Sequence, residues 1–118
     1  IAIYDTTQND ASLEKILQRY KNAYRGELKV VTSGNSWIDF IAPNANKGTA
    51  LQALLDYLHL TPEECMVFGD QYNDLEMLKL AGTSYAMTTC APGVEKYADY
   101  QTDTVEEILK ELLDQLDR

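Results

Sequence analysis

The 118 residues include ten lysines and arginines against nineteen aspartates and glutamates, which gives a formal net charge of −9 at neutral pH. This acid excess argues against binding to nucleic acid or to an anionic membrane surface, because both attract basic proteins. Hydrophobic residues make up 45% of the chain and charged residues 25%, a composition typical of a folded globular domain. Any anionic ligand would therefore have to be held by local groups.

The sequence carries no signal for export or membrane insertion. No apolar run approaches the roughly 20 residues of a membrane span, and the first residues lack the basic and then apolar layout of a secretory signal. Cys65 and Cys90 stand alone, without a C-x-x-C spacing or a histidine cluster, which argues against a disulfide framework and a zinc site. We expect a cytoplasmic protein with two unpaired thiols.

The first 44 residues indicate a small α+β lobe. A short apolar strand over 1–4 is followed by a helix whose apolar residues recur on one face, at Leu13, Ile16, Leu17, Tyr20 and Tyr24. Two strand-like runs, 28–32 and 36–41, flank Ser33-Gly34-Asn35, which we expect to form a tight turn. The polar break at 43–46 then separates this lobe from the rest of the chain.

From Lys47 onward the pattern alternates between helix and strand. It predicts helices over 47–58, 73–81, 92–98 and 105–116, and strands over 66–69, 85–87 and 99–102. We expect Asn73 to cap the second of these helices and 99–102 to be an edge strand. The last helix has an unbroken apolar stripe, which we expect to pack on the sheet. This order is that of half of a doubly wound α/β sheet.

Polar residues follow the buried strand that ends at Gly69. In open parallel sheets ligands bind at the carboxyl ends of the strands, which is where Asp70 is placed. Asn73 and Asp74 open the next helix, where backbone N–H groups favour an anion. Oxygen ligands of this kind suit Mg²⁺. A single aspartate in such a place is more often a solvated cap or turn residue, but the combination of the spacing, the glycine and the preceding buried strand favours a site.

Lys47 is the second candidate, because a cation at the start of a helix opposes the helix dipole. Its position indicates that some anion offsets that cost. An ordinary surface lysine is the alternative, and the local sequence leaves it open.

Two strings of residues carry a resemblance to a known family. Residues 46–51 (N-K-G-T-A-L) and 67–78 (V-F-G-D-Q-Y-N-D-L-E-M-L), supported by Ala86-Met87 and Ala98-Asp99-Tyr100, resemble the C-terminal half of the Cof-type haloacid dehalogenase-like (HAD-like) phosphatases. The resemblance covers about residues 25 to 118. It implies an α/β fold that is the second half of a HAD-like doubly wound parallel sheet, residues 45–118, preceded by the end of an α+β cap domain, residues 1–44.

The resemblance also implies a function and roles for named residues. The expected activity is Mg²⁺-dependent hydrolysis of small phosphorylated metabolites, sugar phosphates among them, through an aspartyl-phosphate. Lys47 and Asp70 would be catalytic, with Lys47 steadying the charge of the phosphoryl group. Lys47 and Asn73 would bind the substrate phosphate, and Asp70 and Asp74 would belong to the Mg²⁺ site. Positioned cations of this kind stabilise charge in phosphoryl transfer.

The chain also departs from the family pattern. It begins at Ile1 rather than Met and contains no D-x-D, so the D-x-D-G-T nucleophile is absent from it. Thr88-Thr89-Cys90-Ala91 stands where the family has G-N-A. We therefore expect a fragment that is inactive by itself. We also expect the sheet edge at 67–70 to pair with the missing N-terminal half or with another chain.

Two other functions remain open. A receiver-like signalling domain also ends a strand on an aspartate, but its lysine follows that aspartate, whereas Lys47 precedes Asp70. A catalytically inactive acidic interaction module would use the apolar stripe of the last helix. We expect Trp37 and the tyrosines to pack in cores rather than contact substrate, and His59 to cap a helix end rather than take part in catalysis.

Overall fold

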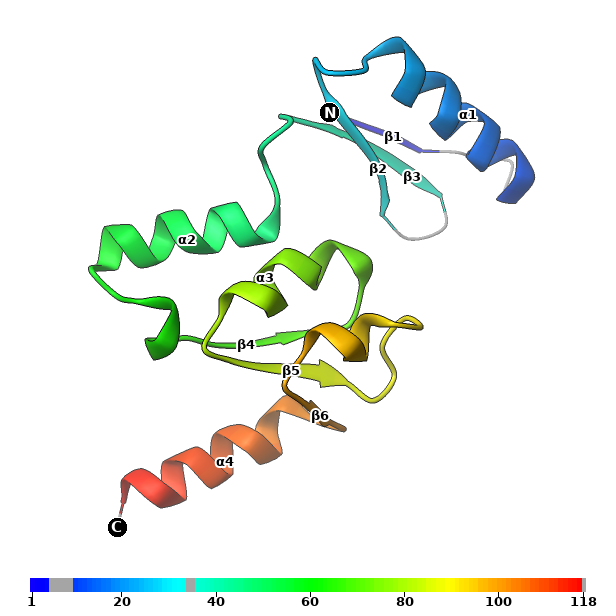
Figure 1. Cartoon of the computed structure of the whole chain (residues 1–118). Helices are drawn as coiled ribbons and strands as arrows, with labels where there is room; N and C mark the ends of the chain where they lie inside the picture. Colours follow the sequence, from blue (N-terminus) through cyan, green and yellow to red (C-terminus); the bar gives the residue numbers. More distant parts are fainter. Residues whose placement is uncertain (5–9, 34–35, 118) are drawn as a thin grey trace. The chain divides into compact units, whose positions relative to one another are not determined.

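The computed structural model describes residues 1–4, 10–33 and 36–117. The chain divides into two compact units, Ile1–Ala45 and Asn46–Arg118, and each unit is described by itself (Figure 1). The predicted boundary, after residue 44, lies one residue earlier. Nothing in the fold by itself identifies the first unit as a cap domain, so that assignment stays a prediction.

The first unit is a three-stranded antiparallel sheet with one helix. Its elements are β1 (Ala2–Tyr4), α1 (Asp10–Ala23), β2 (Lys29–Ser33) and β3 (Trp37–Ile41), and the strand order is β1-β3-β2. Helix α1 packs on one face of the sheet, where a core forms from Leu13, Val30 and Ile38. The predicted α+β lobe is therefore observed, while Gly34 and Asn35 of the predicted turn lie outside the described residues.

The second unit alternates helices and parallel strands. In chain order it contains α2 (Lys47–Leu58), η1 (Pro62–Glu64), β4 (Met66–Gly69), η2 (Tyr72–Asp74), α3 (Leu75–Leu80), β5 (Thr83–Met87), η3 (Val94–Tyr97), β6 (Tyr100–Thr102) and α4 (Val105–Leu116). The strand order is β4-β5-β6, with both pairings parallel. The expected α/β class is confirmed, and β6 is an edge strand.

The core of this unit lies between the sheet and α3. Val67 of β4, Ala86 of β5, Leu78 of α3 and Val94 of η3 are buried together, and Leu51 of α2 packs against them. Helix α2 approaches α3 closely at Gly48, where an added Cβ would lie 2.7 Å from Cβ of Glu76. The absence of a side chain at this position therefore sets the spacing of the two helices.

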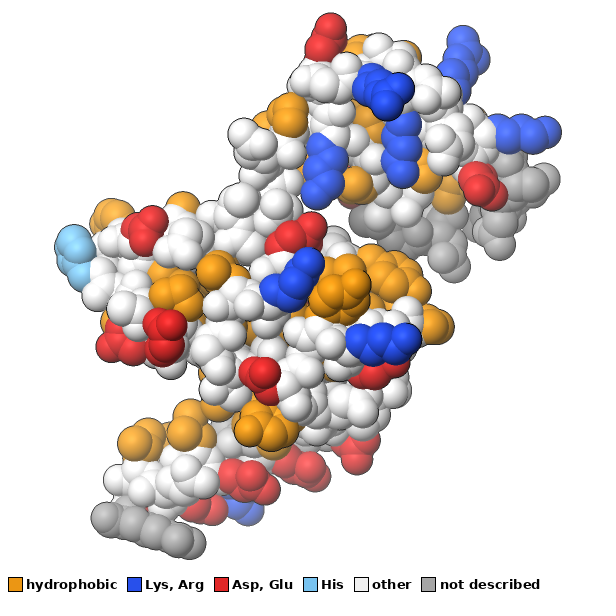
Figure 2. All heavy atoms as spheres, viewed as in Figure 1, with side chains coloured by type: hydrophobic (Ala, Val, Ile, Leu, Met, Phe, Trp, Pro, Cys, Tyr) orange, Lys and Arg blue, Asp and Glu red, His pale blue; other side chains and the backbone are white. Residues whose placement is uncertain are grey.

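The opposite face of the sheet and helix α4 are more open. Phe68, Tyr85 and Tyr100 form a row across the three strands, with neighbouring ring centroids 5.3 Å apart. None of the twelve described residues of α4 is buried, and Leu116 is 74% exposed. Figure 2 shows hydrophobic side chains along one side of α4 and acidic ones along the other.

The expectation that the apolar stripe of α4 packs on the sheet is therefore wrong for this chain. Its leucines are amphipathically spaced as predicted, but the described part of the chain has no element lying over them. The exposed leucines are Leu109, Leu112, Leu113 and Leu116. Among the described residues, no helix is both long enough and apolar enough to cross a membrane.

The close approach at Gly48 predicts whether an alanine at this position raises or lowers the free energy of unfolding. Alanine normally stabilises a helix by about 0.5–1 kcal/mol relative to glycine. We expect Gly48→Ala instead to lower the free energy of unfolding by about 1 kcal/mol or more, because the methyl group meets Glu76. Urea denaturation measures the change.

A control for this prediction lies on the same helix. Ala53 is exposed on α2, so Ala53→Gly should lose only the ordinary preference of about 1 kcal/mol. A stabilising effect of Gly48→Ala would contradict the tight packing of α2 on α3.

Candidate functional site

Asp70 follows the last residue of β4, at the carboxyl end of the parallel sheet. Its backbone is held on both sides: its N–H donates to Oδ2 of Asp74 over 2.8 Å, and its carbonyl accepts from the N–H of Ala91 over 2.8 Å. Its side chain is exposed and has no hydrogen bond to any described residue. The backbone contacts therefore hold in place a carboxylate that remains available to a ligand.

Asp74 lies beneath this loop and is 3% exposed. Its Oδ2 accepts from the N–H groups of Asp70 and Gln71, at 2.8 and 3.1 Å, while its Oδ1 accepts from Lys47. An added Cβ on Gly69 would lie 2.8 Å from Cβ of Asp74. The glycine of the G-D pair therefore makes room for the carboxylate that organises the loop.

The helix start differs from the prediction. Residues 72–74 form the 3₁₀ turn η2, and α3 begins at Leu75, with Asp74 at its N-cap position. The expectation that Asn73 caps this helix is wrong, because Asp74 takes the loop's N–H groups instead. Asn73 is exposed, and its side chain has no hydrogen bond to any described residue. Its amide is therefore free to contact a ligand.

Lys47 is the first residue of α2, and its side chain is half exposed. The preceding turn is fixed by Asn46, whose Oδ1 accepts from the N–H of Thr49 over 2.8 Å. The Lys47 ammonium group forms an ion pair with Asp74. The anion that the sequence led us to expect beside Lys47 is thus, at least in part, a carboxylate of the chain itself. The structure brings Lys47, Asp70 and Asp74 together from two segments far apart in sequence.

The pKa of Asp74 lies below its ordinary value of 3.8. Burial acts to raise it, but the hydrogen bond from Lys47, the N–H groups of Asp70 and Gln71 and the charge of Lys47 together outweigh burial. Because the folded-state pKa is lowered, ionised Asp74 stabilises the fold fully above pH 3.8. That contribution is lost as the pH falls further through the lowered pKa.

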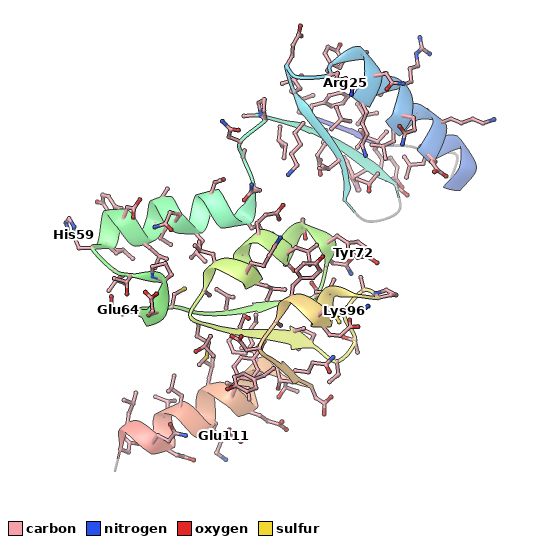
Figure 3. The ribbon with its side chains drawn as sticks, in the orientation of Figure 1. Arg25, His59, Glu64, Tyr72, Lys96 and Glu111 are labelled. Atoms are coloured by element: carbon pink, nitrogen blue, oxygen red, sulfur yellow. The ribbon has the colours of Figure 1, made fainter. Side chains whose placement is uncertain are left out.

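The loop after β5 borders the loop that carries Asp70. Besides the Ala91 contact, the hydroxyl of Tyr72 donates to the carbonyl of Pro92 over 2.9 Å, and Figure 3 shows Tyr72 beside this loop. Glu95 also restrains this loop, because its Oε2 accepts from the N–H of Gly93 over 3.0 Å. The sequence analysis singled out the loop that contains Ala91 but gave Tyr72 no role, because a bond to a backbone carbonyl leaves no signature in residue type.

The oxygen atoms of the Asp70 and Asn73 side chains suit a cation whose other ligands are mostly water. No group of three or more His, Cys, Asp or Glu side chains that could hold a metal ion occurs in the described ranges. Asp70 offers a carboxylate, and Asn73, on the same loop, offers an amide oxygen. Mg²⁺ is commonly held by one or two carboxylates, several waters and substrate phosphate, so these residues fit that ion better than one needing a full protein cage.

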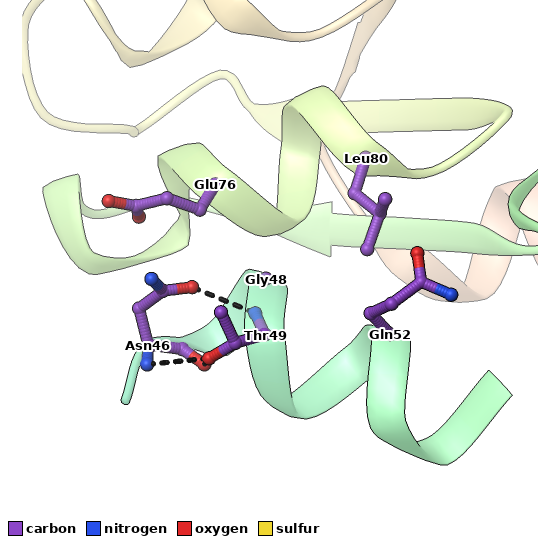
Figure 4. Close-up of a pocket in the computed structure, with 6 residues that line it drawn as sticks. All are labelled: Asn46, Gly48, Thr49, Gln52, Glu76 and Leu80. Atoms are coloured by element: carbon purple, nitrogen blue, oxygen red, sulfur yellow. Dashed lines mark hydrogen bonds between the residues drawn. The ribbon is translucent and has the colours of Figure 1, made fainter. Parts of the chain in front are cut away.

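A shallow pocket of about 310 Å³ lies between α2 and α3. Figure 4 shows its lining, which includes Asn46, Gly48 and Glu76 but none of Lys47, Asp70, Asn73 and Asp74. The pocket is therefore beside the candidate site and not part of it. His59 caps the far end of α2 in a left-handed conformation, φ 57°, and lies away from the carboxyl end of β4 (Figure 3).

Comparison with known proteins identifies the family of the chain. The family model described as haloacid dehalogenase-like hydrolase matches residues 1–112. A 5-amino-6-(5-phospho-D-ribitylamino)uracil phosphatase of Bacillus subtilis is 35% identical over 101 residues, covering 86% of this chain and 39% of that protein. An HMP-PP phosphatase of Cronobacter sakazakii is 47% identical over 55 residues, covering 47% of this chain and 20% of that protein.

Solved structures give the same result. A haloacid dehalogenase-like hydrolase from Bacteroides thetaiotaomicron superposes with a TM-score of 0.80 at 28% identity, covering 94% of this chain and 42% of that one. A protein from Streptococcus mutans gives a TM-score of 0.80 at 31% identity, with 96% and 44% covered. The chain thus spans less than half the length of these relatives. With the family model matching nearly all of its residues, the chain belongs to the haloacid dehalogenase-like hydrolases.

Proposed function

We propose that this chain carries the phosphate-binding and metal-binding residues of a Mg²⁺-dependent phosphatase that hydrolyses small phosphorylated metabolites, sugar phosphates among them. One observation carries the proposal: the buried carboxylate of Asp74 holds both the ammonium group of Lys47 and the backbone of Asp70. A cation and a free carboxylate are thereby fixed together at the carboxyl end of β4, which is where ligands bind in open parallel sheets.

Each residue has a separate task in this proposal. Lys47 neutralises charge on the phosphoryl oxygens, and Asp74 positions Lys47 through the ion pair. Asp70 and Asn73 would hold Mg²⁺ and the substrate phosphate, with Asp74 supporting that site from beneath. The ion would supply further positive charge to the transferring group.

The net charge of the second unit explains why binding of a phosphate dianion would need a metal ion in addition to Lys47. The segment Asn46–Arg118 has five basic and fourteen acidic residues, whereas Ile1–Ala45 has five of each. A phosphate dianion approaching Asp70 therefore meets a strongly negative unit. Lys47 alone is half exposed and already paired with Asp74, so a divalent cation at Asp70 is the further source of attraction that the substrate requires.

The phosphoryl acceptor has to come from outside these 118 residues, which contain no D-x-D. The phosphatases named above support a small phosphorylated metabolite as substrate, because the printed activity of the Bacillus subtilis relative is on a phosphorylated ribitylaminouracil. A cytoplasmic location fits such a substrate and stays a prediction. The family match favours this function over the receiver-like alternative.

We further propose that another polypeptide segment covers the free edge of β4 and the apolar stripe of α4. No described strand pairs with that edge, and the α4 leucines are 38–74% exposed. Parallel sheets are normally buried on both faces and paired at their central strands. The segment would be the part of the hydrolase that lies outside this chain, or a second chain in its place.

Metal binding tests the proposed site. We expect isothermal titration with Mg²⁺ to give weak binding, and Asp70→Asn to reduce the affinity at least about 10-fold, because it removes the free carboxylate. Asp114→Asn is the matched control: it makes the same charge change on exposed α4 and should leave the affinity within about 2-fold. Equal effects of the two substitutions would contradict a site at Asp70.

A phosphatase assay on the same protein tests whether these 118 residues can catalyse hydrolysis by themselves. We expect the 118-residue chain to show no turnover of p-nitrophenyl phosphate, because it lacks the D-x-D nucleophile. Turnover that Asp70→Asn abolishes would show that catalysis needs no further segment.

Analytical sedimentation tests whether the β4 edge and the α4 stripe associate with another polypeptide. We expect the chain alone to self-associate as its concentration rises, and Leu113→Gln on the exposed stripe to weaken that association. Glu111→Gln on the same helix is the control, because it leaves the leucines in place. A monomer at every concentration, with a cooperative thermal transition, would count against the proposal.

A further inference from the structure

We propose that Tyr72 is a positioning residue of the candidate site, which sets the orientation of Asp70 toward Mg²⁺ through the backbone rather than by contact with the ion. It does so by holding residues 88–93, called here the β5 loop, against residues 70–73, called here the Asp70 loop. The inference rests on the proposed function, because it takes Asp70 as a ligand of Mg²⁺. Both loops belong to the second unit.

Two hydrogen bonds join the β5 loop to the Asp70 loop within the described part of the chain. The N–H of Ala91 donates to the carbonyl of Asp70 over 2.8 Å, and the hydroxyl of Tyr72 donates to the carbonyl of Pro92 over 2.9 Å. One hydrogen bond alone would leave the two loops free to rotate about it. The second bond removes that freedom, so the pair fixes the orientation of one loop relative to the other.

The β5 loop is restrained well enough to act as an anchor. The N–H of Cys90 donates to the carbonyl of Met87 over 3.0 Å, which ties the loop to the end of β5. Pro92 has a fixed φ and also restricts the backbone of Ala91 before it. Gly93 then turns the chain at a φ of 92°. The carbonyl that accepts from Tyr72 is therefore held in a defined place by the loop itself.

Tyr72 does not act as a core residue. The expectation that Trp37 and the tyrosines pack in cores is wrong for Trp37, which is 45% exposed, and for Tyr72, which is 57% exposed. The core of the second unit forms around Val67 and Leu78, without Tyr72. A phenol this exposed gains little from burial. Its contact with the β5 loop is therefore the main contribution of this side chain.

This contact bears directly on the site, because Tyr72 lies on the loop between Asp70 and Asn73, whose side chains are free to meet a ligand. Asp74 holds the same loop through the N–H groups of Asp70 and Gln71. Mg²⁺ bound mostly by water has few protein ligands that could correct a misdirected carboxylate. Groups that orient a metal ligand commonly change metal affinity 10-fold or more. Loss of the second loop contact should therefore weaken binding.

Mg²⁺ titration of Tyr72→Phe tests this role, because the substitution removes only the hydroxyl group. We expect isothermal titration to show an affinity at least about 3-fold lower, with little change in urea unfolding, because the side chain is exposed. Tyr57→Phe is the matched control: Tyr57 on α2 is 80% exposed, and its hydroxyl has no hydrogen bond to any described residue. This control should leave the affinity unchanged.

A second variant approaches the same contact from the β5 loop. Gly93 has a left-handed backbone that alanine adopts only with strain, so Gly93→Ala should displace the loop and weaken Mg²⁺ binding. Added to Gly93→Ala, Tyr72→Phe should cost less affinity than it costs in the wild-type chain, because both changes act through one contact. If Gly93→Ala does not fold, Tyr72→Phe alone decides.

Hydrogen exchange supplies a measurement that needs no metal. The N–H of Ala91 forms the other bond between the loops, so its exchange should be at least about 3-fold faster in Tyr72→Phe, because the loops separate more readily. Tyr57→Phe should not change it. An Ala91 exchange rate that is the same in Tyr72→Phe and in the wild-type chain would overturn the proposal.

The titrations separate this proposal from the proposed metal site. If Asp70→Asn weakens Mg²⁺ binding and Tyr72→Phe does not, the positioning role is wrong and the metal site stands. If Mg²⁺ binding is absent, or is unaffected by Asp70→Asn, the metal site is wrong and the positioning role fails with it. A Tyr72→Phe variant that unfolds more easily but binds Mg²⁺ like the wild-type chain would show a purely structural role and overturn the proposal.

Discussion

The buried carboxylate of Asp74 is the contact on which the candidate site depends. One of its oxygens holds the N–H groups of Asp70 and Gln71, and the other holds the ammonium group of Lys47. A charge this deeply buried is tolerated only when it is paired and hydrogen-bonded. The same bonds that satisfy Asp74 therefore fix the loop after β4 and the start of α2 in one arrangement.

Two glycines make that arrangement sterically possible. Gly69 leaves room for Asp74 under the strand end, and Gly48 lets α2 approach Glu76 on α3. A methyl group at either position would meet a neighbouring side chain at less than 3 Å. The glycines of the K-G and G-D pairs thus serve packing, and through packing they place Lys47 and Asp70.

Much of this fold could be predicted because periodicity and strand-end residues are local signals. Short runs of sequence are enough to predict the strand that ends at Gly69, the edge strand β6 and the helix that begins at Lys47. The sequence predicted a helix start at Asn73, whereas α3 begins at Leu75. The Asp74 carboxylate accepts from the N–H groups of Asp70 and Gln71 and from Lys47, and the contact with Lys47 is not a local signal. Exposure of the α4 leucines and of Trp37 depends on which elements lie over them, and spacing along the chain does not encode this. The hydrogen bond from Tyr72 to the backbone carbonyl of Pro92 could not be predicted from the sequence either.

A double-mutant cycle on Lys47 and Asp74 tests most directly whether their ion pair organises the site. Urea unfolding of Lys47→Met, Asp74→Asn and the double variant should give a coupling of about 1 kcal/mol at neutral pH, moderated by the half exposure of Lys47. Because the pKa of Asp74 is lowered from 3.8, the coupling should persist through pH 4 and disappear only as the pH falls through that lowered pKa. Additive effects at neutral pH would contradict the account.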